Sequence, residues 1–387
     1  MGDKDISGTI VRTSTIPEEL GRVGYLLTDK TGTLTRNEME LKKLHMGTMA
    51  FAGDEGMEEV KRVVRGGASV SVGGGGPVGA GGAGARGRDI GTRVKDIVFA
   101  LALCHNVTPV FSDDEREVQY QASSPDEVAI VKWTAQVGLT LHHRSLTHIQ
   151  LELDSIPSAD WNQHASHHNH HQLISPTSTS STSPFPTSPH QTPIIVSYKI
   201  LHTFPFTSES KRMGIIIRDV QTNEIWFLVK GADGVMSPLV RYNDWLDEEC
   251  GNMAREGLRT LVVARRRLSE DEFQQFDESY TRAMVDVSFS RGDKIKAAMR
   301  GIERDLELLG LTGVEDKLQE DVKITLELLR NAGLKIWMLT GDKIETAQCI
   351  AVSSKLVARN QGIHVISKGE EGCVLFLVGF SDLTRKK

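Results

Sequence analysis

The sequence has few cysteines, no long apolar run and no excess of basic charge, and each absence excludes a class of protein. The four cysteines form no Cys-x-x-Cys pair and lack a histidine at zinc-finger spacing, so we expect reduced thiols rather than disulfides or structural zinc. No apolar run approaches the roughly 20 residues that span a bilayer, and the polar amino terminus is no signal peptide. The net charge of -6 provides no overall basic field for nucleic acid.

The clearest chemical signal lies near the amino terminus, in the pentapeptide Asp29-Lys30-Thr31-Gly32-Thr33. The apolar run before it predicts a parallel strand buried on both faces, which delivers Asp29 at the carboxyl edge where open α/β sheets place their chemistry. A glycine turn rich in hydroxyl and backbone N–H groups suits a carboxylate that attacks phosphorus and becomes an aspartyl phosphate. A lone Asp before such a turn is usually structural, but the pentapeptide as a whole favours the chemical role.

Partners for this strand recur late in the chain. Leu308–Gly313 and Lys335–Leu339 predict two further strands of the same α/β domain, joined by a helix with apolar residues every three to four positions and Gly333 at its end. Thr340 then emerges at the same sheet edge as Asp29, where its hydroxyl can donate to a phosphoryl oxygen. We therefore expect an interrupted domain, with a first segment at 1–45, an inserted domain at 46–302, an incomplete second segment at 303–371 and an unmatched tail at 372–387.

The inserted domain contains ordered elements and two stretches of biased composition. Residues 66–91 are rich in glycine and residues 155–193 in Ser, Thr, Pro and His, and neither has the apolar content to form a core, so we expect disordered inserts and no metal site in the histidine run. The remaining pattern predicts an antiparallel sheet with flanking helices. The expected helices are 91–103, 125–137, 245–256 and 270–285, and the expected strands are 194–204, 212–218, 224–230 and 260–266.

The pentapeptide resembles the phosphorylation motif of P-type ATPases, which belong to the haloacid-dehalogenase superfamily. The flanking residues Thr13–Gly21 and Arg36–Met39 are most similar to the phospholipid-flippase class, in its Neo1-like branch. This resemblance implies an α/β fold, with a haloacid-dehalogenase-like (Rossmann-like) phosphorylation domain interrupted by an α+β nucleotide-binding domain. It also implies an ATP-driven, phospholipid-translocating enzyme with ATP and Mg²⁺ as cofactors.

The resemblance assigns roles to individual residues. Phe206 matches the aromatic that stacks on adenine, and a π-face beside a cation such as Lys211 suits a purine. Asp29 is the nucleophile, and its carboxylate together with the Thr31 carbonyl would hold Mg²⁺. The implied catalytic residues are Asp29, Lys30, Thr31, Thr340 and Asp342. The implied nucleotide-binding residues are Glu127, Phe206, Lys211, Lys230, Arg259, Asp316, Thr340, Gly341 and Asp342.

Three functions stay open from the sequence. The first is the cytoplasmic catalytic segment of a flippase-type ATPase. The second is a truncated nucleotide-binding module without turnover, because the likeness stops near Lys368 and no Gly-Asp-Gly-x-Asn-Asp motif follows. The third is a soluble phosphatase of the same superfamily, although those enzymes usually carry a second Asp where this chain has Thr31.

The resemblance also sets expectations for partners and location. The full-length protein is expected at the cytoplasmic face of a Golgi or endosomal membrane, with its phospholipid substrate bound only through membrane helices absent from this chain. ATP is the expected small-molecule partner, an accessory subunit is left undefined, and no nucleic acid is expected. The chain itself is expected to be a fragment or truncated product.

Overall fold

A computed structural model describes residues 15–66, 90–110, 118–154, 194–241, 244–288, 290–342 and 344–357, with two short pairs at 363–364 and 378–379. The chain divides into two compact units. Unit 1 comprises residues 1–39, 249–259 and 315–387, and unit 2 comprises residues 40–248 and 260–314. The expected inserts at 66–91 and 155–193 fall almost wholly outside the described residues, as does most of the expected tail.

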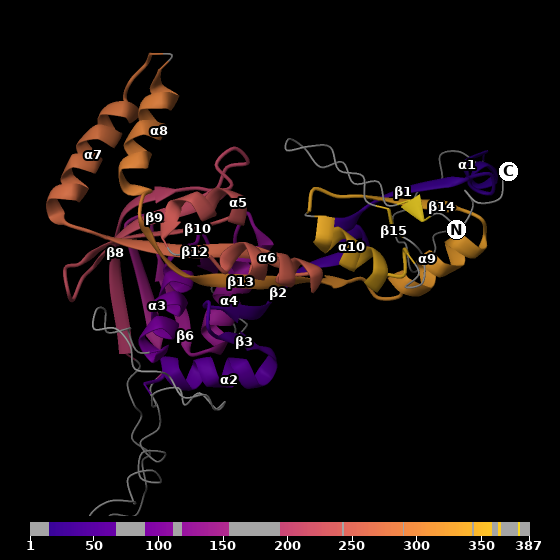
Figure 1. Cartoon of the computed structure of the whole chain (residues 1–387), viewed down its shortest axis with the longest axis horizontal. Coiled ribbons are helices and arrows are strands. Elements are labelled where there is room, and N and C mark those ends of the chain that lie inside the picture. The colour runs from indigo at the N-terminus through magenta and orange to yellow at the C-terminus, as the bar shows by residue number, and fades with distance from the viewer. Residues whose placement is uncertain are drawn as a thin grey trace, which may run out of the picture. The chain divides into compact units, whose positions relative to one another are not determined.

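Unit 2 is built on a large sheet whose central strands are antiparallel (Figure 1). Its strand order is β3-β2-β13-β12-β10-β9-β8-β7-β6, and β11 pairs with β13 in parallel. The strands are β2 (Thr35–His45), β3 (Ala50–Ala52), β6 (Leu139–Arg144), β7 (His148–Leu153), β8 (Ile194–Phe204), β9 (Arg212–Asp219), β10 (Ile225–Gly231), β11 (Val240–Arg241), β12 (Arg259–Leu268) and β13 (Leu306–Leu318). A separate two-stranded ladder joins β4 (Thr108–Val110) to β5 (Gln119–Gln121).

The hairpin between β9 and β10 shows how local sequence sets the register of this sheet. Asp219 opens the turn by accepting backbone N–H groups from Gln221 and Thr222, and its own N–H donates to the Glu224 carbonyl. Asn223 takes the left-handed conformation at φ 58°, which Asn tolerates better than most residues. The register that follows pairs Lys230 with Met213.

The main core of unit 2 lies between the sheet and three helices, α2 (Gly53–Val64), α3 (Ile90–Leu103) and α4 (Pro125–Gln136). Val94, Ile97 and Leu101 follow helical spacing along α3 and are fully buried, so this face of the helix provides much of the apolar contact. Pro125 begins α4, where its missing N–H costs nothing because the first turn has no intrahelical acceptor for it. The core therefore fixes α3 and α4 against the strands that carry the site of unit 2.

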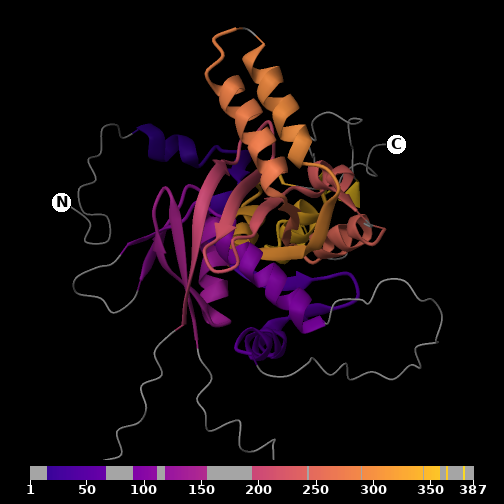
Figure 2. The same cartoon turned by 90° about the vertical axis from the view of Figure 1, so that its left-hand side faces the viewer.

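Two further helices, α7 (Glu270–Met284) and α8 (Arg291–Ile302), pack against each other as a hairpin, drawn in orange in Figure 2. Ser269 and Glu272 form a reciprocal capping box at the start of α7, with each side chain bonded to the other residue's backbone N–H. Shorter helices α5 (Asp233–Met236) and α6 (Leu246–Arg255) follow β10 and β11. The division between the units falls inside α6, β2, β12 and β13.

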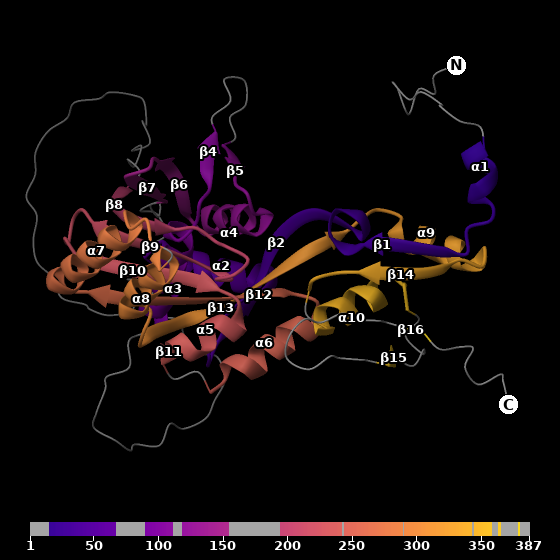
Figure 3. The same ribbon diagram turned by 90° about the horizontal axis from the view of Figure 1, so that it is seen from above.

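In unit 1, β1 (Tyr25–Asp29) and β14 (Lys335–Leu339) form a two-stranded parallel sheet, seen side by side in Figure 3. One sheet face packs on α9 (Val322–Asn331) and α10 (Ile344–Ser353), around the buried residues Leu326, Met338 and Ala347. Tyr25 and Leu27 of β1 are exposed, so the prediction that this strand is buried on both faces was wrong, because an apolar run does not specify what covers each face. Other short elements are α1 (Thr15–Leu20), β15 (Ile363–His364) and β16 (Val378–Gly379).

One expected strand belongs to a different sheet. Leu308–Gly313 is indeed extended, within β13, but β13 lies between β2 and β12 of the large sheet and does not pair with β1. The prediction that it joins the Asp29 strand was wrong, because an apolar run specifies a buried strand without specifying its partner. The two compact units divide the chain at 39/40, 248/249, 259/260 and 314/315, and the domain bounds expected at 45/46 and 302/303 stay a prediction.

Candidate functional site

The carboxyl end of β1 leads into a tight turn that presents Asp29. The Asp29 side chain is exposed, and its Oδ1 accepts the Lys30 backbone N–H at 2.7 Å. Gly32 takes φ 77°, a left-handed conformation that costs a glycine little and most other residues more. Asp29 lies opposite Leu339 in the parallel register, so the following residue, Thr340, leaves β14 at the same edge.

The Lys30 ammonium is enclosed between two carboxylates of unit 1. Its side chain is 1% exposed, and Nζ lies 3.2 Å from Oδ2 of Asp316 and 2.8 Å from Oδ2 of Asp342. A buried ammonium is costly unless it is paired, and two carboxylates meet that requirement. Lys30 therefore links β13 and the segment after β14 to the turn that carries Asp29.

Thr35 is a residue that sequence reasoning missed. It is fully buried, and its Oγ1 donates to Oδ2 of Asp316 at 2.8 Å while accepting the Gly32 backbone N–H at 3.1 Å. The hydroxyl thus fixes the turn and a lysine-bound carboxylate at once. The only available sequence signal was its place two residues after the pentapeptide, which does not identify its partners.

The segment after β14 closes the same edge of unit 1. Thr340 Oγ1 accepts the Asp342 backbone N–H at 3.2 Å, which orients the threonine hydroxyl near the strand end. Arg259 approaches from a distant part of the chain, with Nε 4.0 Å from Oδ1 of Asp342. The structure thus brings Lys30, Asp316, Asp342 and Arg259 into one network. The sequence had assigned Lys30 to the catalytic residues, Asp316 and Arg259 to the nucleotide-binding residues, and Asp342 to both.

The residues at this edge could hold Mg²⁺ only together with water and phosphate oxygens, which would supply its other ligands. Across the described ranges, no group of three or more His, Cys, Asp or Glu side chains is arranged to hold a metal ion. Asp29 offers an exposed carboxylate, and Mg²⁺ commonly takes one or two protein carboxylates while keeping water and phosphate oxygens as its other ligands. The donor set is compatible with that kind of site.

Unit 2 brings together two of the residues expected to bind nucleotide. Lys230 Nζ, at the end of β10, lies 2.9 Å from Oε1 of Glu127 in the first turn of α4, and their side chains are 4% and 10% exposed. The other Glu127 oxygen accepts the Asn106 backbone N–H at 3.2 Å. Glu127 thereby ties α4 to β10 and to the segment after α3.

The loop between β8 and β9 holds the other two expected residues. Phe206 is 61% exposed, which is unusual for a phenylalanine with only a packing role. Lys211 follows at φ 47°, and its carbonyl accepts the Ala232 backbone N–H at 3.0 Å. This bond fixes the end of the loop beside the residues that follow Lys230.

Three further polar groups surround the Lys230–Glu127 pair, and the sequence did not identify them. Cys104 is fully buried, and burial raises the pKa of its thiol to about 12. Burial, together with the Arg144 and Lys230 cations, holds the pKa of His105 well below its ordinary range. Burial also lowers the pKa of the Arg144 guanidinium, while the nearby Cys104 and Glu127 act in the opposite direction.

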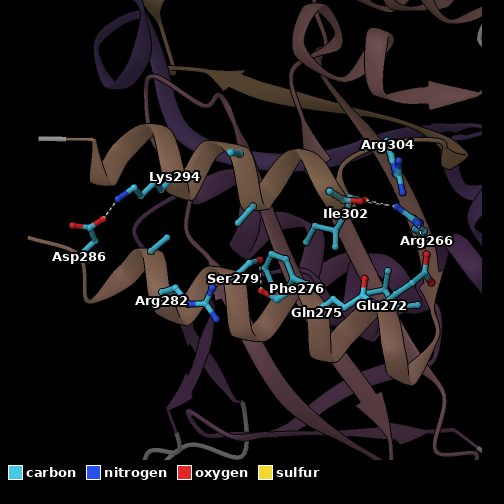
Figure 4. Close-up of a pocket in the computed structure, with 15 residues that line it drawn as sticks. Arg266, Glu272, Gln275, Phe276, Ser279, Arg282, Asp286, Lys294, Ile302 and Arg304 are labelled. Atoms are coloured by element: carbon cyan, nitrogen blue, oxygen red, sulfur yellow. Dashed lines mark hydrogen bonds and ion pairs between the residues drawn. The ribbon is translucent and has the colours of Figure 1, made fainter. Parts of the chain in front are cut away.

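A separate groove of about 740 Å³ lies between α7, α8 and the end of β12 (Figure 4). Its acidic side chains already have cationic partners, because Glu272 pairs with Arg266 at 2.6 Å and Asp286 pairs with Lys294. Phe276 and Ile302 provide an apolar wall. The groove contains no pair of groups arranged for acid–base or nucleophilic chemistry among the residues that line it.

The fold and these sites can now be compared with known proteins. The family described as "P-type ATPase, cytoplasmic domain N" matches residues 93–321, which is more than half of the chain. The chain belongs to the P-type ATPase family. The matched residues overlap the inserted domain expected at 46–302, whose bounds stay a prediction.

Individual relatives agree on the branch of the family. The chain is 49% identical to "Probable phospholipid-transporting ATPase IIB" of Homo sapiens, over 96% of this chain and 32% of the relative. It is 48% identical to "Phospholipid-transporting ATPase NEO1" of Saccharomyces cerevisiae, over 95% of this chain and 28% of the relative. The expected resemblance to the Neo1-like branch of phospholipid-transporting P-type ATPases is confirmed.

The chain spans about a third of the length of these curated relatives. No helix within the described ranges is long and apolar enough to cross a bilayer. The individual roles of the site residues stay predictions.

Proposed function

We propose that this chain is the cytoplasmic ATP-binding and phosphorylated segment of an ATP-driven phospholipid-translocating enzyme. The observation that supports this most directly is the parallel pairing of β1 with β14, which puts Asp29 and Thr340 at one strand edge of unit 1. A nucleophilic carboxylate and a hydroxyl donor at the carboxyl edge of parallel strands suit phosphoryl transfer. The arrangement of unit 1 is proposed to be haloacid-dehalogenase-like.

In the proposed reaction an Asp29 carboxylate oxygen attacks the γ-phosphorus of ATP. A bond forms between Asp29 and phosphorus while the bond to the β–γ bridging oxygen breaks, and ADP leaves with that electron pair. The Thr340 hydroxyl donates to a phosphoryl oxygen as charge shifts. Lys30 holds Asp316 and Asp342 in place, because its buried ammonium pairs with both carboxylates.

Mg²⁺ is proposed as the cofactor, with the Asp29 carboxylate and the Thr31 carbonyl as its protein ligands. When bound, the ion neutralises charge on the transferred phosphoryl group. The remaining work falls to residues of the chain: Asp29 supplies the nucleophile, the Gly32 turn presents it, and Thr35 fixes that turn through two hydrogen bonds.

The nucleotide itself is proposed to bind unit 2. Phe206 supplies an exposed aromatic face for the adenine ring, worth about 1–3 kcal/mol of stacking, and Lys211 lies on the same loop. Lys230 and Glu127 form the buried charged part of this site. Arg259, near Asp342 in unit 1, is proposed to contact the phosphates through its forked N–H donors.

Substrate class and location are carried over from the relatives as part of the proposal. The printed names describe those proteins as phospholipid-transporting, and we propose the same substrate class for the protein that contains this chain. A Golgi or endosomal membrane is the proposed site of action. Any lipid contact would come from parts of the relatives that this chain does not match.

Two other functions remain to be separated by experiment. A nucleotide-binding module without turnover is favoured by the size of the unit 1 sheet, which has only β1 and β14 among the described residues. A soluble phosphatase is disfavoured by Thr31, because a threonine cannot serve as the acid–base group that promptly hydrolyses an aspartyl phosphate.

The test is labelling of the 387-residue chain with ATP radiolabelled in the γ-phosphate, in the presence of Mg²⁺, followed by acid quenching and hydroxylamine. Asp29→Asn is the test variant, and Asp54→Asn, an exposed carboxylate on α2, is the matched control. Stable, hydroxylamine-labile label that needs Asp29 and persists in the control supports the proposal. ATP binding without any label indicates the binding module, whereas rapid release of phosphate indicates a phosphatase.

A further inference from the structure

Two cations of unit 2 belong to the cluster around Glu127. Lys230 Nζ lies 2.9 Å from Oε1 of this carboxylate, and the Arg144 guanidinium interacts with it electrostatically. Both oxygens of that carboxylate already accept a bond or an ion pair, from the Asn106 N–H and from Lys230. Among the described residues, the guanidinium nitrogen Nη1 of Arg144 is enclosed and has no hydrogen-bond partner.

The two other titratable groups of this cluster cannot supply an anionic partner for the Arg144 guanidinium. His105 accepts the Val107 backbone N–H through Nδ1 at 3.0 Å and donates from Nε2 to the Ala102 carbonyl at 2.9 Å. This pair of bonds requires the neutral imidazole. Cys104 is fully buried, and its thiol donates to the Met213 and Leu228 carbonyls at 3.7 Å, which favours the neutral thiol.

An enclosed donor without an acceptor is costly, and native proteins rarely leave one unpaired. The position of Arg144 follows from its strand. Leu139 and Leu141 of β6 are buried in the core of unit 2, and the register of β6 shifts between Leu141 and His143. After this irregularity Arg144 ends the strand with its guanidinium within electrostatic reach of Glu127.

We propose that Arg144 is a further nucleotide-binding residue that, with Glu127, reads the adenine base. Adenine presents a 6-amino donor flanked by ring-nitrogen acceptors, N1 on one side and N7 on the other. A carboxylate beside a guanidinium donor complements that pattern, since Glu127 keeps lone pairs that can accept from the amino group and Arg144 donates to the ring nitrogen. Guanine carries an oxygen in place of the amino group and would face the Glu127 carboxylate with an acceptor.

The base suits this cluster better than the phosphates do. A triphosphate is strongly hydrated, and burying its charges would be expensive, whereas a neutral ring enters an enclosed polar site at lower cost. The exposed Phe206 ring offers a stacking face for the same base. This inference rests on the proposed function, because it assumes that ATP binds unit 2.

The test uses calorimetric titration of the 387-residue chain with ATP, adenosine, 1-deazaadenosine, 7-deazaadenosine and GTP. In the unchanged chain, we expect one of the two deaza compounds to bind roughly 10–100-fold more weakly than adenosine, as for a lost hydrogen bond to a charged donor. In Arg144→Met, the affinities for ATP and adenosine should fall by the same factor. Adenosine and both deaza compounds should then bind equally well, and the preference for ATP over GTP should shrink.

Two variants keep this test interpretable. Arg144→Lys retains the charge and should fold normally while losing part of the adenine preference, because an ammonium lacks the planar fork. Arg218→Met removes a surface arginine of unit 2 that pairs with Glu270 and should bind every ligand as the unchanged chain does. Thermal unfolding of each variant checks that it is folded.

The outcomes separate the two proposals. Failure of the unchanged chain to bind ATP overturns both the proposed function and the role of Arg144. ATP binding with no deaza penalty, or with equal affinity in Arg144→Met and Arg144→Lys, overturns the role of Arg144 alone. Weakened ATP binding with unchanged adenosine binding would assign Arg144 to the phosphates, which also contradicts base recognition.

Discussion

Removal of Lys230 should destabilise unit 2 far more than removal of an exposed lysine. Lys230 and Glu127 lie 2.9 Å apart with 4% and 10% of their side chains exposed, so at an effective dielectric constant near 20 their attraction is about 6 kcal/mol. Desolvation offsets most of this attraction while both partners are present. In Lys230→Met the buried Glu127 carboxylate loses its close ion pair and keeps only the longer-range influence of Arg144, and we expect a loss of about 3–5 kcal/mol in the free energy of unfolding.

The assay is urea denaturation combined with amide hydrogen exchange, which reports each unit separately. Peptides from β10 should lose protection in Lys230→Met, whereas peptides from α9 in unit 1 should not. Lys296→Met is the matched control, because Lys296 pairs with Glu209 at 2.6 Å but both side chains are more than half exposed. Exposed pairs contribute little, so this variant should unfold like the unchanged chain.

A double substitution tests whether the buried Glu127 charge causes this loss of stability. Lys230→Met with Glu127→Gln removes both charges and should recover much of the lost stability, since the uncompensated carboxylate is then gone. Two results would refute a stabilising role for the buried pair. The first is a loss of less than about 1 kcal/mol in the free energy of unfolding of Lys230→Met. The second is a double variant that is no more stable than Lys230→Met.

Three further outcomes follow from buried polar groups. Thr35→Val should destabilise unit 1 by about 1–3 kcal/mol in thermal unfolding, because Asp316 and the Gly32 N–H each lose a partner, and Thr35→Ser should restore most of it. Burial lowers the pKa of His105. The neutral imidazole therefore contributes stability above the unfolded-state pKa near 6.5, and this contribution is lost as pH falls. In urea titrations, His105→Gln should flatten the acid side of the profile of unfolding free energy against pH. Because burial raises the pKa of Cys104 to about 12, its contribution is lost as pH rises from about 9 towards 12, and the thiol should resist maleimide at pH 8 until urea unfolds the chain.

The sequence predicted individual elements well wherever the signal was local. β8 and β14 have the expected bounds, because strand length, alternation and flanking turn residues are read within a few positions. α4 begins at Pro125 as expected. The pentapeptide that begins at Asp29 likewise needed only neighbouring residues, and the P-type ATPase family it indicated is confirmed by the matches.

Non-local relations were harder to predict. The pattern of Leu308–Gly313 predicts a buried strand, but only the tertiary structure places it between β2 and β12. Thr35 gave no signal, because its partner Asp316 lies 281 positions away in the sequence. The role proposed for Arg144 likewise depends on Glu127, which lies on a different element. The buried state of Lys230 was missed for the same reason, since a lysine at a strand end is usually solvated.

The two sites differ in their described charged groups, and this difference predicts how each should respond to metal removal. At the edge of unit 1, Lys30 and Arg259 pair with Asp316 and Asp342, and Asp29 adds a third carboxylate in the adjoining turn. A phosphate chain approaching these described groups meets more carboxylates than cations, so phosphoryl transfer to Asp29 should require a divalent cation. In unit 2 the Glu127 carboxylate already has the Lys230 ammonium as its partner, so adenosine binding there should not require one. Chelation of Mg²⁺ with EDTA should therefore abolish any Asp29-dependent labelling and leave adenosine affinity unchanged in calorimetry. A loss of adenosine affinity on chelation would mean that a metal ion contributes to the base site, and the charge argument for unit 2 would then be wrong.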